Sequence, residues 1–290
     1  MMHKSMRVFD QLLLIAVIFQ MGLTGCLHSA KPKVLLSCSG PVIIDHTCTG
    51  LSRIPDQWID SAQADIKWYY AHTSHGGQLT IGLERIEKHD SKYDMAIDRD
   101  WLPREAGAVC ILDNAYCGPD KYWKTSGGRK KTQDVIDYNP INLSMWSWCG
   151  QMGVYTGEET QRYLDVMAGF EDAHPEVVFV YMTGHAQHGG SKGYNRHLRN
   201  NQIRGWVRDH PEKNRVLFDF ADLDSWSYDP DTGGWEQATY EHWNGNQYVN
   251  VPIEHARYHG NEKAHTTFES CEQKGKSVWW MLARVAGWQP

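Results

Sequence analysis

Stretches rich in β-branched and aromatic residues alternate with amphipathic stretches along most of the chain, and this alternation restricts the fold more than any other feature. We predict strands at residues 65–70, 141–148, 177–182 and 215–220, and helices at residues 78–88, 156–173, 195–209 and 271–286. Strands that alternate with helices form a parallel sheet with helices on both faces. The sequence therefore predicts an α/β fold, a three-layer α/β/α sandwich with a mainly parallel sheet, as a single domain over residues 41–290.

Two long stretches, residues 89–140 and 224–264, interrupt this pattern. Both are polar and rich in glycine, proline and charged residues, so we expect them to be irregular. Three of the four predicted strands run directly into loops rich in glycine, histidine and serine. In folds of this class the carboxyl ends of the strands carry the chemistry, so we expect the functional site at that edge of the sheet.

The N-terminus is typical of an exported protein. Lys4 and Arg7 precede an apolar run at residues 12–19 that is too short to span a bilayer comfortably. The run continues to Leu23-Thr24-Gly25-Cys26, which resembles the lipobox of bacterial lipoproteins, where the cysteine receives the lipid. A signal peptide cleaved without lipidation and a plain anchor helix are the alternatives.

On this interpretation, residues 1–25 are a lipoprotein signal peptide and residues 26–40 hold the lipidated Cys26 and a short tether. Leu27 follows the cysteine, where an Asp would signal retention at the inner membrane. We therefore expect a protein anchored in the cell envelope, at the outer membrane if the organism has one, and facing the periplasm or the exterior.

The composition of the remaining chain excludes some partners. Removing residues 1–25 takes away two of the 29 basic residues and one of the 35 acidic ones, which leaves a net charge of −7. This charge argues against nucleic acid as a partner. The hydrophobic content of 41% is enough for a core, and 13 tryptophans are more than a core of this size needs. We expect some of them to line a surface cleft.

Cysteine usage also agrees with export. Six cysteines remain besides Cys26, namely Cys38, Cys48, Cys110, Cys117, Cys149 and Cys271. An even number in an oxidising compartment predicts up to three disulfide bonds, and Cys110 and Cys117 are close enough in sequence to clasp a loop. The chain contains no Cys-x-x-Cys, which argues against a zinc ribbon or a thioredoxin-like site.

Ser74 is the first candidate for chemistry. It lies between a predicted strand and a predicted helix, among His72, His75, Gly76 and Gly77. A serine on such a turn can expose its hydroxyl beside the backbone N–H groups of a helix N-terminus, which suits a nucleophile whose oxyanion needs donors. The alternative is a serine helix cap followed by turn glycines.

Two histidine pairs offer a different interpretation of the same loops. His72 with His75, and His185 with His188, have the i, i+3 spacing of metal ligands. No third ligand with matching spacing is evident, so we expect no metal and no cofactor.

The order of the elements favours a catalytic role for Ser74. Across roughly residues 60–288, a strand, a serine loop and a helix come first, and a histidine precedes the final helix. This order resembles the SGNH/GDSL hydrolases, a family of flavodoxin-like fold. The first block of that family is Gly-Asp-Ser, and here His72-Thr73-Ser74 takes its place, so the serine alone is kept.

The other blocks of the family are matched with substitutions. The family block Gly-x-Asn-Asp supplies an amide to the oxyanion hole, and here Trp148-Cys149-Gly150-Gln151 ends the comparable strand, which makes Gln151 the nearest amide donor. The family block Asp-x-x-His is replaced by Glu262-Lys263-Ala264-His265. The family's second glycine has two candidates, Gly107 and Gly118.

A second resemblance covers most of the mature chain but carries less functional information. Several stretches look like a group of uncharacterised bacterial secreted proteins usually regarded as SGNH-hydrolase-like. They are residues 43–49, 54–55, 72–76, 145–151, 181–185 and 279–284. The resemblance implies a shared function and supplies no substrate.

The resemblance implies a serine esterase that removes acyl groups, such as acetyl groups, from carbohydrate or from a small molecule. His265 would take the proton from Ser74, oriented by Glu262 or by another carboxylate such as Asp219 or Asp222. The Ser74 N–H and the Gln151 amide would hold the oxyanion. The expected substrate contacts are His72, His75, Gly76, Trp148, Gly150 and His185.

Two other functions remain open at this point. The fold could serve a carbohydrate-binding lipoprotein without catalysis, with sugars stacked on Trp146, Trp148, Trp226, Trp235 and Trp243. A polysaccharide lyase or glycosidase could use a histidine with a carboxylate, such as His185 with Asp222.

The lipidation of Cys26 is directly testable. We expect the wild-type protein to incorporate labelled palmitate and to partition into the detergent phase, because a thioether-linked lipid on Cys26 anchors it. Cys26→Ser should abolish both properties. Palmitate labelling that persists in the Cys26→Ser variant would rule out this anchor.

Overall fold

The computed structural model describes residues 40–290. The expected signal peptide, lipidated Cys26 and most of the tether, together with Cys38, lie outside the described residues. Within residues 40–290, no helix has the length and apolarity that crossing a membrane requires.

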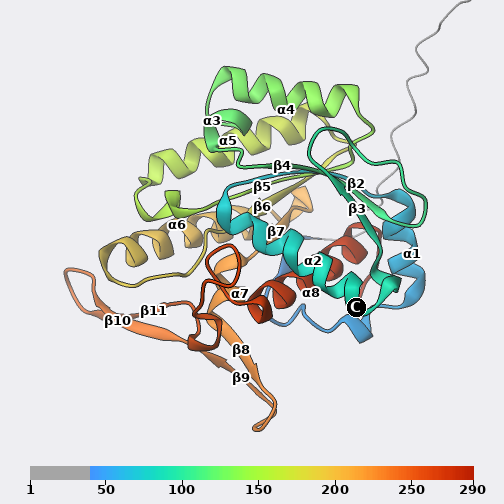
Figure 1. The fold of residues 1–290 in the computed structure, drawn as a ribbon. Helices are drawn as coiled ribbons and strands as arrows, with labels where there is room; N and C mark the ends of the chain where they lie inside the picture. Colours follow the sequence, from blue (N-terminus) through green and yellow to red (C-terminus); the bar gives the residue numbers. More distant parts are fainter. Residues whose placement is uncertain (1–39) are drawn as a thin grey trace, which may run out of the picture.

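A seven-stranded sheet forms the middle of the molecule (Figure 1). Its strand order is β1-β7-β6-β5-β2-β4-β3, and every neighbouring pair is parallel. The strands are β1 (Val42–Ile44), β2 (Lys67–His72), β3 (Met95–Asp98), β4 (Val109–Ala115), β5 (Leu143–Ser147), β6 (Val178–Met182) and β7 (Val216–Phe218). Strands β2, β5 and β7 are buried almost throughout, as expected for a parallel sheet covered on both faces.

Helices cover the sheet on both sides, which confirms the predicted flavodoxin-like three-layer sandwich. On one side α1 and α2 pack against α8, and on the other α3 packs against α4 and α5 against α6. The helices are α1 (Asp56–Asp65), α2 (Gly77–His89), α3 (Pro119–Tyr122), α4 (Ser126–Tyr138), α5 (Gly157–Ala173), α6 (Gly190–Arg208), α7 (Phe220–Ser225) and α8 (Phe268–Val285). The start of α5 is fixed by a capping box between Thr156 and Glu159.

The two polar stretches are more regular than their composition suggested. Residues 89–140 contain β3, β4, α3 and α4, and residues 224–264 contain two antiparallel hairpins. The hairpins are β8 (Trp226–Asp229) with β9 (Gly234–Gln237), and β10 (Thr239–Trp243) with β11 (Tyr248–Pro252). They project from the sheet on the side of α7 (Figure 1). Their polar composition follows from their exposure, because hairpins outside the core need few apolar residues.

The expected disulfide bonds are not formed among the described cysteines. Cys48, Cys110, Cys117, Cys149 and Cys271 are all free thiols. The clasp between Cys110 and Cys117 fails because β4 runs extended through most of the residues between them. Six extended residues span about 20 Å, whereas the two Cα atoms of a disulfide lie about 6 Å apart.

Helices α2 and α8 touch backbone to backbone. A Cβ atom on Gly82 of α2 would lie 1.9 Å from the carbonyl oxygen of Cys271 in α8, and one on Gly275 would lie 2.5 Å from the carbonyl carbon of Gly82. No side chain fits at either position without pushing the helices apart. Because Ser74 precedes α2 and His265 precedes α8, this contact sets how closely the two residues approach.

We predict that Gly82→Ala lowers the free energy of unfolding by at least about 2 kcal/mol, because the added methyl overlaps the α8 backbone. Urea unfolding followed by circular dichroism measures the change. Gly169→Ala is the matched control, since it lies inside α5 with open space around its Cβ position. It should stabilise by about 0.5–1 kcal/mol through helix propensity. Equal stability of the two variants would contradict the close contact.

Candidate functional site

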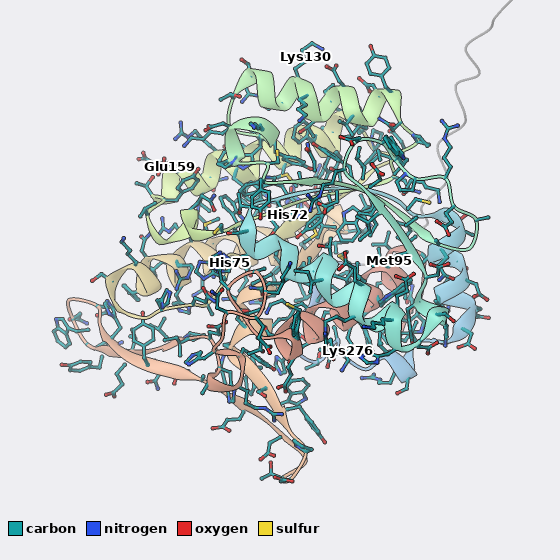
Figure 2. All side chains as sticks on the ribbon, in the orientation of Figure 1. His72, His75, Met95, Lys130, Glu159 and Lys276 are labelled. Carbon is teal, nitrogen blue, oxygen red and sulfur yellow. The ribbon has the colours of Figure 1, made fainter. Side chains whose placement is uncertain are left out.

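The polar residues expected to carry chemistry gather where the sheet changes its winding direction. After β2 the chain forms β3 and β4 on one side of β2, and it then crosses back to form β5 on the other side, so β2 and β5 flank the switch point. Ligands of open α/β sheets bind outside the carboxyl ends of the strands at this point. Ser74 follows β2 and Cys149 follows β5. Figure 2 shows His72 and His75 in this region, between the sheet and the hairpins.

Ser74 and His265 meet, although 191 residues separate them. The Ser74 Oγ lies 3.0 Å from the His265 Nε2. His265 sits on a turn in which it and Ala264 both have positive φ angles of 72° and 46°. The Gln78 side chain, at the start of α2, donates to the carbonyl of Ala264 at 2.8 Å. The turn that carries His265 is therefore tied to the helix that follows Ser74.

The carboxylates expected to orient His265 are engaged elsewhere in the described structure. Glu262 accepts from the backbone N–H of Phe268 at 2.7 Å and so serves the first turn of α8. Asp219 forms a bidentate ion pair with Arg204, with oxygen–nitrogen distances of 2.6 Å. Asp222 lies 2.6 Å from His46 Nδ1. The prediction that one of these three holds His265 is wrong, because each has its own nearer partner.

Cys149, expected in a disulfide, instead lies at the centre of the site. Its Sγ is 3.2 Å from the Ser74 Oγ and 3.0 Å from the His75 Nδ1. The other ring nitrogen of His75, Nε2, is 2.9 Å from the Gln187 Oε1. A carbonyl oxygen only accepts, so Nε2 carries a proton and His75 shares its second proton with the sulfur.

The contact with His75 makes Cys149 acidic. Burial alone would raise the pKa of the Cys149 thiol, but the hydrogen bond and charge of His75, with the hydrogen bond from Ser74, lower the pKa to about 6. Burial alone would lower the pKa of His75, but the bond to Cys149 and its charge, with the bond to Gln187, raise it. These two opposite directions favour a thiolate at Cys149 paired with an imidazolium at His75.

The pKa values of the two histidines beside His75 are lowered, in contrast to that of His75 itself. The rings of His265 and His185 stack on His75 with centroids 4.8 and 4.0 Å away. Burial and then the positive charge of His75 lower the pKa of both neighbours, that of His185 well below its usual range. His185 also accepts from the Gln187 backbone N–H through Nδ1 at 3.0 Å. The neutral form is therefore favoured at both neighbours, and the charged form at His75.

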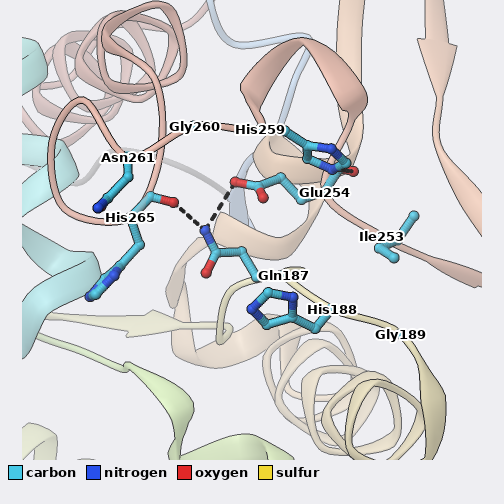
Figure 3. A pocket seen from close by; sticks show the side chains of 9 residues that line it. All are labelled: Gln187, His188, Gly189, Ile253, Glu254, His259, Gly260, Asn261 and His265. Carbon is cyan, nitrogen blue, oxygen red and sulfur yellow. Dashed lines mark hydrogen bonds between the residues drawn. The ribbon is translucent and has the colours of Figure 1, made fainter.

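Gln187 joins the two halves of the site (Figure 3). Its Nε2 donates to the carbonyl oxygen of His265 and to Glu254 Oε1, the latter at 3.3 Å. The carbonyl of His265 can only accept, which fixes the orientation of the Gln187 amide and points Oε1 at His75. Burial and then the charge of Asp224 raise the pKa of Glu254 to about 7.

The other expected substrate contacts have mixed outcomes. His72 lies in β2 and is buried beside the site, with its Nε2 2.8 Å from the Asp113 Oδ1. Gly76 packs against the ring of His72, where a Cβ would lie 2.3 Å from the His72 Cβ. Gly150 is exposed, directly after Cys149. Gln151 turns its Oε1 back to accept from the Cys149 N–H at 2.6 Å.

The tryptophans are divided between the core and the surface, and Trp235 lines a cavity of about 510 Å³ together with Tyr228 and Arg257. Trp146 and Trp148 are core residues, and the indole of Trp148 donates to the Met182 carbonyl at 2.8 Å. The expected contact between Trp148 and substrate is therefore wrong, because its ring packs among other aromatic rings. Trp226 and Trp235 flank His46 with ring centroids 4.3 and 5.0 Å away, and Trp243 is 52% exposed on its hairpin.

Two cavities open on either side of His265. One has a volume of about 780 Å³ and is lined by Ser74, Asp98, Arg99 and Lys263 among others. The other has a volume of about 580 Å³ and is lined by Gln187, Glu254 and the loop before His265. Both volumes lie in the range of small-molecule sites. A substrate whose reacting carbon lies at Ser74 can place its two parts on the two sides of His265.

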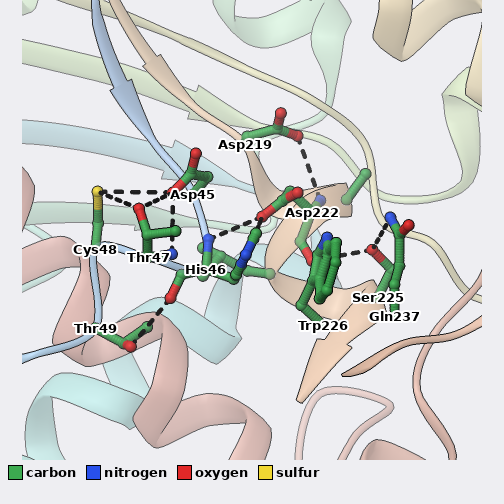
Figure 4. Close-up of polar contacts among 12 residues, drawn as sticks. Asp45, His46, Thr47, Cys48, Thr49, Asp219, Asp222, Ser225, Trp226 and Gln237 are labelled. Carbon is green, nitrogen blue, oxygen red and sulfur yellow. Dashed lines mark hydrogen bonds and ion pairs between the residues drawn. The ribbon is translucent and has the colours of Figure 1, made fainter. Parts of the chain in front are cut away.

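One cluster could in principle hold a metal ion. Asp45, His46 and Asp222 offer ligand atoms within 4.8 Å of one another (Figure 4). Each is already bonded within the protein, since Asp222 contacts His46 and Asp45 accepts from the Thr47 hydroxyl at 2.6 Å. Asp222 thereby pairs with His46, and not with His185 as a lyase or glycosidase was expected to need.

Sequence reasoning missed Cys149, Gln187 and Glu254. Cys149 lies directly before Gly150 and Gln151, which were expected in the site. The even number of cysteines instead predicted a disulfide bond for Cys149. Gln187 follows the chosen His185 by two residues, and no pattern in the sequence distinguishes it. No protein-family model matches this chain, and no curated protein is significantly similar to it.

We predict that Gln187→Leu lowers the free energy of unfolding by at least about 2 kcal/mol. It removes the partner of the His75 Nε2 and of the His265 carbonyl and one of the two donors to the Glu254 Oε1, and each unsatisfied buried group costs about 1–3 kcal/mol. Thermal and urea unfolding measure the change. Gln57→Leu, on the exposed side of α1, is the control and should stay within about 0.5 kcal/mol of wild type. A Gln187→Leu variant as stable as this control would show that the hydrogen bonds of Gln187 contribute little to the stability of the fold.

Proposed function

We propose that this protein is a serine esterase of SGNH type, anchored to the cell envelope through lipid on Cys26, that removes acyl groups from carbohydrate. The observation that carries the proposal is the 3.0 Å contact between the Ser74 Oγ and the His265 Nε2. It joins a residue after the first long strand to a residue before the last helix, at the switch point where ligands of such sheets bind.

The proposed reaction begins with neutral His265. Its Nε2 accepts the proton of Ser74 as the Oγ attacks the ester carbonyl, and it later returns that proton to the leaving alkoxide. Backbone N–H groups at the start of α2 stabilise the oxyanion, since a helix N-terminus attracts negative charge. Gln151, held against the Cys149 N–H, is the proposed second donor.

The larger cavity supports a hydroxylated substrate. Besides Ser74 and His265, its wall includes Asp98, Arg99 and Lys263, which offer both donors and acceptors. Sugar hydroxyls need both kinds of partner. A non-catalytic carbohydrate-binding role has less support, because two of the five tryptophans assigned to it, Trp146 and Trp148, are buried in the core.

Loss of either member of the dyad should remove most esterase activity. We expect Ser74→Ala and His265→Ala each to lower kcat by about 10³-fold or more on p-nitrophenyl acetate or an acetylated sugar, and the double variant to be little worse. Gln151→Ala should cost about 10²–10³-fold.

The controls are Ser91→Ala and His89→Ala, which change exposed residues beyond the opposite end of α2 and at that end. Both should retain full activity. The serine mechanism fails if Ser74→Ala keeps its activity, and loss of activity on chelation would then indicate a metal-dependent reaction.

A further inference from the structure

Cys149 has a more complete set of partners than Ser74. Nucleophilic catalysis needs a nucleophile, a base within hydrogen-bond reach, and a third group that orients the base. Cys149, His75 and Gln187 meet this requirement, with successive distances of 3.0 and 2.9 Å. Gln187 is itself held by Glu254 and by the His265 carbonyl. Within the described residues, the His265 ring is hydrogen-bonded to Ser74 and has no second hydrogen-bond partner that would orient it.

We propose that Cys149 is a second nucleophile of this site, which attacks the acyl carbon of amides and thioesters with His75 as its acid–base partner and Gln187 as the residue that positions His75. This reaction goes beyond the proposed ester hydrolysis and does not depend on it, because neither His75 nor Gln187 requires the Ser74 hydroxyl for its bonds.

The reaction balances with water as the co-reactant. The Cys149 thiolate attacks the carbonyl carbon and forms a C–S bond, and the carbon–nitrogen or carbon–sulfur bond to the leaving group then breaks. The His75 imidazolium gives its proton to the leaving amine or thiol. Neutral His75 next accepts a proton from water as the water oxygen attacks the acyl-cysteine. The C–S bond breaks, a carboxylic acid leaves, and the thiolate–imidazolium pair is restored.

The leaving group follows from the protonation states of the two histidines. An amine leaves an acyl carbon only with a proton, and His75 holds one when it is paired with the Cys149 thiolate. Neutral His265 must first collect its proton from Ser74, which suits an ester. The two nucleophiles also exclude each other, because the Ser74 Oγ and the Cys149 Sγ are 3.2 Å apart and face the same position.

The surroundings of Cys149 favour its thiolate, whereas those of Cys48, Cys117 and Cys271 disfavour theirs. His75 contacts the sulfur directly, the rings of His185 and His265 stack on His75, and Gln187 donates to Glu254, whose charge interacts with that of Asp224. Burial instead raises the pKa of Cys48 and of Cys271 to about 11, and it raises the pKa of Cys117. These cysteines serve as internal controls in any labelling experiment.

The first test is the pH dependence of alkylation. Full-length protein is treated with iodoacetamide between pH 5 and 9, and the modified cysteine is identified by peptide mass spectrometry. We expect Cys149 to react first, with a midpoint near pH 6, and His75→Gln to move that midpoint above about pH 8. The midpoint is the readout, because the rate of a low-pKa thiolate is offset by its lower nucleophilicity.

The second test detects the acyl-enzyme. Ser74→Ala protein is mixed with S-phenyl thioacetate and its intact mass is measured. We expect one acetyl group, mapped to Cys149, and none in the Ser74→Ala/Cys149→Ala double variant. Gln187→Asn, which keeps an amide, should form the adduct faster than Gln187→Leu.

The outcomes separate this proposal from the esterase. A midpoint at or above pH 8 in wild type, or absence of acetyl on Cys149 in folded Ser74→Ala protein, overturns the second nucleophile and leaves the Ser74 esterase untouched. Acetylation of Cys149 together with full esterase activity in Ser74→Ala would instead remove the serine mechanism and keep this one.

Discussion

The contact between the backbones of α2 and α8 underlies the whole site. Gly82 and Gly275 let the two helices approach until no Cβ fits between them. Helix α2 begins shortly after Ser74, and α8 begins shortly after the turn that carries His265. The separation of the two helices therefore constrains the distance between the proposed nucleophile and its base. The sheet positions the third reacting group, because β5 lies next to β2 and brings Cys149 beside Ser74.

Three stacked histidines give this small site both an acid and a base at one pH. The contact with Cys149 raises the pKa of His75 in spite of burial, whereas burial and then the charge of His75 lower the pKa of His185 and His265. Protonated His75 can therefore donate a proton while the adjacent ring of His265 accepts one. The amide of Gln187 bonds to one histidine ring and to the backbone of another, so it couples the positions of both groups.

The sequence predicted the fold because apolar runs and amphipathic helices are local signals, and it paired Ser74 with His265 because their places in the element order meet in such sheets. Strand β4 and helix α4 were missed because the polar segments around them hide short periodic patterns. Cys149 was misjudged because an even number of exported cysteines favours disulfides, whereas its real partner, His75, is brought near by the sheet. Glu262 had the right spacing, but its carboxylate accepts a hydrogen bond from the Phe268 N–H at the start of α8 instead.

The position of α8 at the end of the fold has a consequence for biosynthesis. A growing chain exposes Ser74 and Cys149 long before the glycine face of α8 exists, and during that time Ser74 has no histidine at position 265. The His75–Gln187 pair likewise lacks the loop that fixes the Gln187 amide. Packing of Gly275 against Gly82 completes both sets at once. For the proposed chemistry, both sets of partners are therefore complete only after α8 has been synthesised and has packed against α2.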